Sequence, residues 1–232
     1  MLSANDEPTT GIDPTVVGLS RAPAGKAAFK DHMETRPREG KSPERLQHIW
    51  IITGPAGCGK TTVAKGLEKE LGLPFLEGDD FHPQSNKDKM GNGIPLTDAD
   101  RWDWLISLRD AATEILSPSP ANNYNPPWGV IMSCSALKHK YRDVMRVAAY
   151  DHPSVRIHFI YLRADESILM ERVNDRKSHY MKSSMVHSQV ETLEDPSPER
   201  DVLTVDVAAP PDEVQRRVSA AVAAKLAEYE QQ

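Results

Sequence analysis

A glycine-rich run at residues 54–61 carries the strongest chemical signal in the sequence. It reads Gly-Pro-Ala-Gly-Cys-Gly-Lys-Thr and matches the pattern G-x-x-x-x-G-K-[ST] at every fixed position. Glycines in such a loop let successive backbone N–H groups converge on phosphate oxygens at the N-terminus of a helix. The Lys60 ammonium then reaches the β- and γ-phosphates, and the Thr61 hydroxyl is a ligand for Mg²⁺. The run predicts a nucleoside triphosphate site made by Gly54, Pro55, Ala56, Gly57, Cys58, Gly59, Lys60, Thr61 and Thr62.

An acidic run, Glu77-Gly-Asp-Asp-Phe-His82, follows the next apolar segment along the chain. Ligands of open parallel sheets bind at the carboxyl ends of the strands, so we expect these side chains near the phosphate loop. One carboxylate, which we assign to Asp79, could take a proton from the hydroxyl of an acceptor. A second, assigned to Glu77, could hold a Mg²⁺-bound water. The alternative is an acidic turn that only caps a helix.

Cationic side chains in three later segments suit a small anionic acceptor that carries several hydroxyl groups. A guanidinium pairs with a carboxylate through two hydrogen bonds, so Arg101 and Arg142 are the favoured partners of an acid group. Taken singly, each cation could equally be a solvated surface charge. The full set is Lys89, Arg101, Lys138, His139 and Arg142. Hydroxyl groups of the acceptor could be bound by Asp79, Asp80, His82 and Asn86.

The composition limits the class of protein. The chain has 232 residues, 39% hydrophobic and 27% charged, which fits one globular domain, or one domain with an appendage. The net charge of −6 argues against broad binding to nucleic acid or to an anionic membrane, and no apolar run approaches the roughly 18 residues of a membrane span. Two cysteines exclude a disulfide framework, and we interpret Cys58 as a tolerated small residue, not a nucleophile or redox switch. We expect a cytoplasmic protein.

Strands and helices alternate along the chain after residue 47. Short apolar, β-branched runs predict the strands, and apolar positions at helical spacing predict the helices. This order is typical of an α/β fold of the P-loop NTPase type, a parallel five-stranded sheet with helices on both faces. Residues 117–129, rich in Pro and Asn, are expected to form a surface loop. The expected strands are 48–53, 74–77, 130–134, 156–162 and 202–207, and the expected helices are 60–71, 97–112, 136–149, 165–174 and 212–229.

The first 47 residues differ in character from the rest of the chain. They contain five prolines and show neither the strand nor the helix period of apolar residues. Such a segment cannot bury enough apolar surface to offset the entropy of ordering it. We expect residues 1–47 to be a disordered or extended tail, with a targeting or regulatory segment as the alternative, and residues 48–232 to be the kinase-type domain.

Six runs, in order and with plausible spacing, together resemble the gluconokinase family, which is related to shikimate kinase and the nucleoside-monophosphate kinases. The likeness extends from about residue 49 to about residue 207. The resemblance implies a nucleoside-monophosphate-kinase-like fold with a helical lid at about 175–190. It also implies transfer of a phosphoryl group from ATP, with Mg²⁺, to the 6-hydroxyl of D-gluconate, and it leaves a homodimer open. The runs are residues 54–61, 77–83, 86–90, 93–102, 133–143 and 179–194.

The resemblance also implies roles for single residues. Arg172 and Pro210 would pack on opposite faces of adenine, and Arg176 in the lid would reach the transferring phosphoryl group. Arg172 and Arg176 are four residues apart and so point the same way on a helix, although an exposed basic helix end is the alternative. The catalytic residues are then Lys60, Asp79 and Arg176. The acceptor is expected to contact Asp79, His82, Lys89, Arg101, Lys138, Arg142 and Gln189.

Other functions remain open on the sequence alone. A kinase for shikimate or for a nucleoside monophosphate would use the same loop. A regulatory protein could bind ATP as a conformational ligand without transferring phosphate. An RNA kinase conflicts with the negative net charge. The predicted partner is a small molecule, with no nucleic acid and no membrane.

Overall fold

The structure is a computed structural model of the 232-residue chain that describes residues 45–150, 152–175 and 183–231. The predicted tail therefore lies outside the described residues except for its last three positions, and Gln47 already belongs to the first strand. Arg176 and residues 177–182 of the predicted lid also lie outside them. No helix in the described ranges is both long and apolar enough to cross a bilayer.

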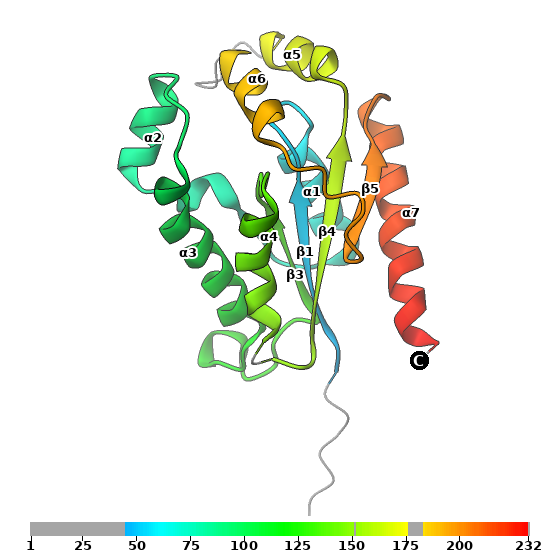
Figure 1. Ribbon diagram of the computed structural model, residues 1–232. Helices are drawn as coiled ribbons and strands as arrows, with labels where there is room; N and C mark the ends of the chain where they lie inside the picture. Colours follow the sequence, from blue (N-terminus) through cyan, green and yellow to red (C-terminus); the bar gives the residue numbers. More distant parts are fainter. Residues whose placement is uncertain (1–44, 151, 176–182, 232) are drawn as a thin grey trace, which may run out of the picture. The chain divides into compact units, whose positions relative to one another are not determined.

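The five predicted strands form one parallel sheet in the order β2-β3-β1-β4-β5 (Figure 1). β1 lies between β3 and β4, so the strand order switches direction at its carboxyl end, where open sheets of this kind bind ligands. β1 is buried on both faces, which is why it reads as a continuous apolar run. The strands are β1 Gln47–Thr53, β2 Phe75–Glu77, β3 Gly129–Ser133, β4 Val155–Arg163 and β5 Val202–Asp206.

Helices cover both faces of the sheet. Trp50 and Ile52 of β1 belong to the core shared with α1, α5 and α7, whereas Ile49 and Ile51 belong to the core shared with α3 and α4. Alternate residues of one strand thus fill two separate cores, as the strand period requires. The helices are α1 Lys60–Leu71, α2 Gln84–Gly91, α3 Asp98–Leu116, α4 His139–Arg146, α5 Glu166–Asn174, α6 Ser183–Thr192 and α7 Pro211–Glu230.

The predicted helices are confirmed, with shifts at their ends that have local causes. α1 ends at Gly72, whose φ of 63° is the left-handed C-cap that glycine favours. α3 begins at a capping box formed by Thr97 and Asp100. The helix predicted from residue 136 begins only at His139, because Ala136 has a φ of 37° that no helix accommodates. The loop predicted at 117–129 joins α3 to β3 over residues 117–128, since Gly129 already begins β3, and it contains a short 3₁₀ turn, Pro120–Asn122.

Two buried histidines link β1 to β4 away from the carboxyl ends of the strands. His48 Nδ1 and His158 Nε2 are 3.0 Å apart, and the two side chains are 4% and 1% exposed. The Trp50 ring stacks on both imidazoles, and the Tyr229 ring meets both edge-on from α7. Such a dry environment disfavours the charged imidazolium, so both rings are held neutral.

Candidate active site

The glycine-rich loop joins β1 to α1 as predicted, and its glycines carry the backbone angles that the turn needs. Gly57 has a φ of 85°, and a Cβ there would lie 2.7 Å from the Leu169 carbonyl oxygen. Gly59, with a φ of 98°, caps the start of α1. The Lys60 ammonium lies over the loop and donates to the carbonyl oxygens of Gly54 at 3.0 Å and Pro55 at 3.1 Å. The loop thus presents a helix N-terminus and a cation to one space, which suits a phosphate group.

Three hydroxyl and carboxylate groups connect the ends of α1, β2 and β3. Thr61 Oγ1 donates to Glu77 Oε2 at 2.7 Å, and Ser133 donates to the other oxygen of the same carboxylate. The Ser133 hydroxyl accepts in turn from the Gly78 N–H at 3.1 Å. The predicted metal residues Thr61 and Glu77 are therefore adjacent, and Ser133, which the sequence did not indicate, orients the carboxylate between them.

This pair fits a Mg²⁺ ion, although it is not a complete metal cage. Mg²⁺ keeps several waters and is bound by one or two protein oxygens together with substrate phosphates. No cluster of three or more His, Cys, Asp or Glu side chains among the described residues could hold a metal by itself. A hydroxyl and a carboxylate beside a phosphate loop are the donor set that a nucleotide-bound Mg²⁺ requires.

A cavity opens next to Lys60, and five predicted site residues line it. These are Lys60, Asp79, His82, Arg101 and Gln189, contributed by the phosphate loop, the 3₁₀ turn Gly78–Phe81 with the residue that follows it, α3 and α6. Asp80, which follows Asp79 in the same turn, is not part of the lining. The remaining lining residues are Met90, Leu96, Trp104, Ser135, Leu137 and Met185. The cavity therefore places a lysine of the phosphate loop and a carboxylate around one small space.

His82 enters the cavity as a neutral ring. Its side chain is buried and stacks on Trp104, with ring centroids 4.0 Å apart. Burial, with repulsion from Arg101 and Lys87, lowers the pKa of His82 to about 4. Trp104 is held in place by a 2.6 Å hydrogen bond from its indole N–H to the Gly78 carbonyl. A neutral imidazole can exchange hydrogen bonds with a hydroxyl group, whereas it cannot balance the charge of a carboxylate.

Gln189 reaches from α6 to the phosphate loop. Its Oε1 accepts a hydrogen bond from the Ala56 N–H at 2.7 Å, so the helix that covers residues 183–190 of the predicted lid is in direct contact with the loop. Gln189 thereby borders both the loop and the cavity.

Four of the five predicted acceptor cations, Lys89, Lys138, His139 and Arg142, do not line the cavity, and His139 Nδ1 lies 2.9 Å from a carboxylate oxygen of Asp143. Lys89 pairs with Asp100 at 2.6 Å, and Lys138 pairs with Asp98 at 3.2 Å. Neither is among the residues that line the cavity. Arg101 is the cation that remains beside Lys60, and one of its terminal nitrogens donates to the Leu96 carbonyl.

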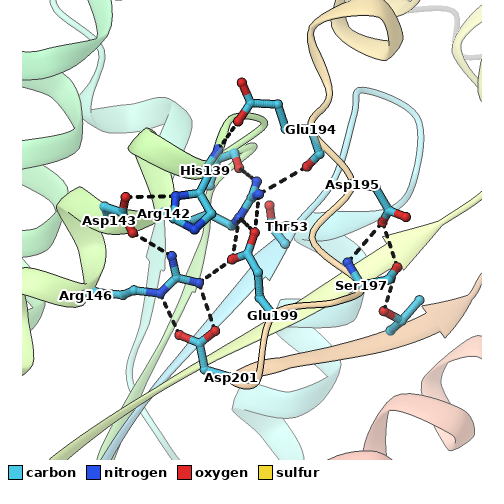
Figure 2. Close-up of polar contacts among 12 residues, drawn as sticks. Thr53, His139, Arg142, Asp143, Arg146, Glu194, Asp195, Ser197, Glu199 and Asp201 are labelled. Atoms are coloured by element: carbon cyan, nitrogen blue, oxygen red, sulfur yellow. Dashed lines mark hydrogen bonds and ion pairs between the residues drawn. The ribbon is translucent and has the colours of Figure 1, made fainter.

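The prediction that Arg142 binds the acceptor carboxylate is wrong. Its side chain is 1% exposed, and its Nε lies 3.0 Å from each carboxylate oxygen of Glu199 (Figure 2). The terminal nitrogens donate to the carbonyl oxygens of Ala136 and Glu194. A guanidinium whose charge and donors are satisfied inside the protein is not available to a ligand.

A second pocket, of about 480 Å³, is lined by residues of the phosphate loop, α1, α5 and α7. Arg172 of α5, which the resemblance assigns to the adenine site, lines it and donates to the Val207 carbonyl at 2.7 Å. Pro211 lines the pocket, whereas the predicted Pro210 does not. The other lining residues are Gly57, Cys58, Gly59, Thr62, Val63, Gly66, Asp175, Asp212, Val214 and Gln215.

Cys58 is buried within this loop. Its side chain is 1% exposed, and burial raises the pKa of the thiol above its ordinary value. Since the thiolate is the reactive form of cysteine, this environment supports the interpretation of Cys58 as a tolerated small residue.

Known proteins are similar to this chain in sequence and structure over most of its length. A family model described as an AAA domain matches residues 49–195. A probable gluconokinase of Schizosaccharomyces pombe is 43% identical over 69% of this chain and 80% of its own length. The thermoresistant gluconokinase of Escherichia coli is 38% identical over 70% of this chain and 86% of its own length. The crystal structure of a gluconokinase from Sinorhizobium meliloti 1021 is 39% identical, has a TM-score of 0.67, and covers 81% of this chain and 97% of that one. The chain belongs to the gluconokinase family of P-loop kinases.

Proposed function

We propose that the protein transfers the γ-phosphoryl group of ATP to the 6-hydroxyl of D-gluconate, giving ADP and 6-phospho-D-gluconate. The proposal rests on one observation, that Lys60 of the phosphate loop and the Asp79 carboxylate line the same cavity. The relatives that match most of the chain are named gluconokinases, which supports gluconate as the acceptor.

In this reaction the protein mainly positions the two substrates and stabilises negative charge. The oxygen of the gluconate 6-hydroxyl attacks the γ-phosphorus in line with the departing ADP oxygen. Asp79 accepts the proton that this hydroxyl loses. Lys60 and the loop N–H groups stabilise the negative charge on the phosphoryl oxygens. Arg101 is the cation proposed for the gluconate carboxylate, and His82 is proposed to hydrogen-bond its hydroxyl groups.

Residues outside the cavity complete the proposal. Thr61 and Glu77 would hold Mg²⁺ beside the phosphates, directly or through water. When bound, that ion neutralises charge on the β- and γ-phosphates. Arg172 is proposed to contact adenine in the second pocket, with Pro210 or its neighbour Pro211 opposite it. The roles of Arg176 in the lid, and of Lys89 and Lys138 toward the acceptor, stay predictions.

An acceptor panel tests the proposal. Purified protein is incubated with ATP and Mg²⁺, and ADP is measured with D-gluconate, its epimers, shikimate, AMP or no acceptor. We expect ADP formation above background with gluconate and a far lower rate with the others. A shikimate or AMP preference would replace the acceptor, and nucleotide binding without any acceptor-dependent ADP would favour a regulatory protein. Lys60→Met is the control that reports contaminating kinases.

Location and assembly are separate proposals. Cys58 and Cys134 are both free and buried, which fits a reducing compartment such as the cytoplasm. Cell fractionation tests this location. Light scattering of the purified protein tests the homodimer that the family resemblance leaves open.

A further inference from the structure

One guanidinium ties together two segments that are far apart in the sequence. Arg142 of α4 donates to the Ala136 carbonyl at 2.9 Å, in the loop that connects β3 to α4. It also donates to the Glu194 carbonyl at 3.1 Å and to the Glu199 carboxylate, both in the segment that follows α6 (Figure 2). We call the group formed by Arg142, Glu194 and Glu199 the clamp.

Glu194 strengthens the same connection from its side. Its N–H donates to the Leu137 carbonyl at 2.9 Å, and its carboxylate accepts from the His139 N–H at 2.6 Å. The segment after α6 is thus bonded directly to the Leu137 carbonyl in the β3–α4 loop and to the His139 N–H at the start of α4, and Arg142 bridges the Glu194 carbonyl to the Ala136 carbonyl.

The β3–α4 loop and α6, the helix that leads into the segment held by Arg142, form walls of the cavity beside Lys60. Ser135 and Leu137 line it from the β3–α4 loop, and Met185 and Gln189 line it from α6. α6 ends at Thr192, two residues before Glu194, so the clamp holds the carboxyl end of this helix. The clamp therefore fixes the distance between these two walls at the carboxyl end of α6.

Arg142 also contacts a loop residue with an unusual backbone conformation. Ala136 has a φ of 37°, in the left-handed region that residues with a Cβ rarely adopt. Such backbone persists only where the surroundings hold it, and the Arg142 bond to its carbonyl is one such restraint. A change at residue 142 would therefore reach Ser135 and Leu137 through the backbone.

Arg146, one turn further along α4, makes an informative contrast. It also pairs with Glu199, and it donates to both carboxylate oxygens of Asp201, at 2.8 and 2.9 Å. The bonds found for Arg146 are to carboxylates, whereas Arg142 adds two bonds to main-chain carbonyls. A buried ion pair is by itself weak evidence of a stabilising role, so these main-chain bonds point to what Arg142 contributes beyond charge pairing.

We propose that Arg142 is a positioning residue that holds α6 against the β3–α4 loop and thereby sets the KM for the acceptor. Gln189 and Leu137 face the acceptor, and Arg142 fixes where they stand without touching it. The kinetic part of this inference rests on the proposed function. A lysine at position 142 keeps a cation for Glu199 but lacks the planar set of donors that reaches both carbonyls.

The structural part is tested by amide hydrogen exchange, followed residue by residue by NMR, on the parent, Arg142→Lys and the matched control Arg146→Lys. We expect faster exchange at the amides of Glu194 and His139 in Arg142→Lys alone, with β1 amides unchanged. Equal exchange at these two amides in the parent and Arg142→Lys, or equal acceleration in both variants, would overturn the proposal. This comparison needs no acceptor.

The functional part is tested by kinetics on the same three proteins. For Arg142→Lys we expect a rise in acceptor KM of about tenfold or more, with kcat and the KM for ATP within about threefold of the parent, since small displacements of positioning groups have large effects. Arg146→Lys should leave all three constants near the parent values. An unchanged acceptor KM in Arg142→Lys would show a purely structural role and overturn the proposal. A parent without gluconate-dependent turnover would overturn the proposed function, and the exchange comparison would still decide the role of Arg142.

Discussion

Lowering the pH from 7 to 5 should destabilise the fold through the buried pair His48 and His158. Burial is the main cause that lowers the pKa of His48 to about 4 and that of His158 to about 3, from 6.5. Repulsion from Arg156 lowers both pKa values further. Repulsion from His48 and Lys225 also lowers the pKa of His158. Because these folded-state values lie below 6.5, the unfolded chain binds more protons at pH 5, so stability is lost as the pH falls from about 6.5.

The size of the loss follows from proton linkage. At pH 5 each histidine is largely protonated in the unfolded chain and largely neutral in the folded protein. The difference between pH 7 and pH 5 is about 2 kcal/mol per histidine, or about 4 kcal/mol for the pair. That is a large share of the total stability of a domain of this size, which is on the order of 10 kcal/mol.

Urea unfolding of the parent and of His158→Leu at the two pH values measures this effect. The variant removes one of the two titrating rings from the core, so its free energy of unfolding should fall by about 2 kcal/mol less than that of the parent between pH 7 and pH 5. His82 and the carboxylates contribute equally to both proteins and cancel. His152→Gln, at an exposed position, should keep the parental pH dependence. Equal losses in the parent and His158→Leu would refute the reasoning.

Three further predictions concern the phosphate loop and the adjacent Glu77 carboxylate. Lys60→Met should lower kcat by about 10² or more with an unchanged circular dichroism spectrum, because the loop cation is lost; activity within tenfold of the parent would contradict its role. Glu77→Gln removes the charge that Thr61 and Ser133 orient, so the Mg²⁺ concentration for half-maximal activity should rise about tenfold, and an unchanged Mg²⁺ titration would argue against this site. Iodoacetamide should leave the folded enzyme active, since burial keeps the Cys58 thiol protonated; rapid inactivation protected by ATP would show otherwise.

The fold was predictable because its buried strands are short apolar runs and its main helices carry apolar stripes. α1 and α3 also have boundary signals in the sequence, Gly72 and the Thr97 capping box. α2 was missed because only Met90 and Asn86 of its eight residues are buried, which leaves no apolar stripe to detect. α6 was expected only as part of a lid, without helix boundaries.

The candidate site was predictable where a local motif defines it. The phosphate loop follows the end of β1, and the run from Glu77 to His82 lies at the end of β2. In each motif the sequence spacing alone indicates where its residues lie. The role of Arg142 was not predictable, because its partner Glu199 lies 57 residues further along and only the folded chain shows the pairing. Ser133 and Trp104 act through hydrogen bonds to Glu77 and Gly78, and nothing in their own sequence positions indicates those contacts.

In the proposed reaction the Asp79 carboxylate accepts a proton from gluconate beside the phosphate loop. The most direct measurement compares gluconate-dependent ADP formation at saturating ATP for the parent, Asp79→Asn and the control Asp80→Asn. We predict that Asp79→Asn lowers kcat by about 10² to 10⁴ while Asp80→Asn, outside the cavity, stays close to the parent. An Asp79→Asn enzyme that keeps the parental kcat would contradict the account.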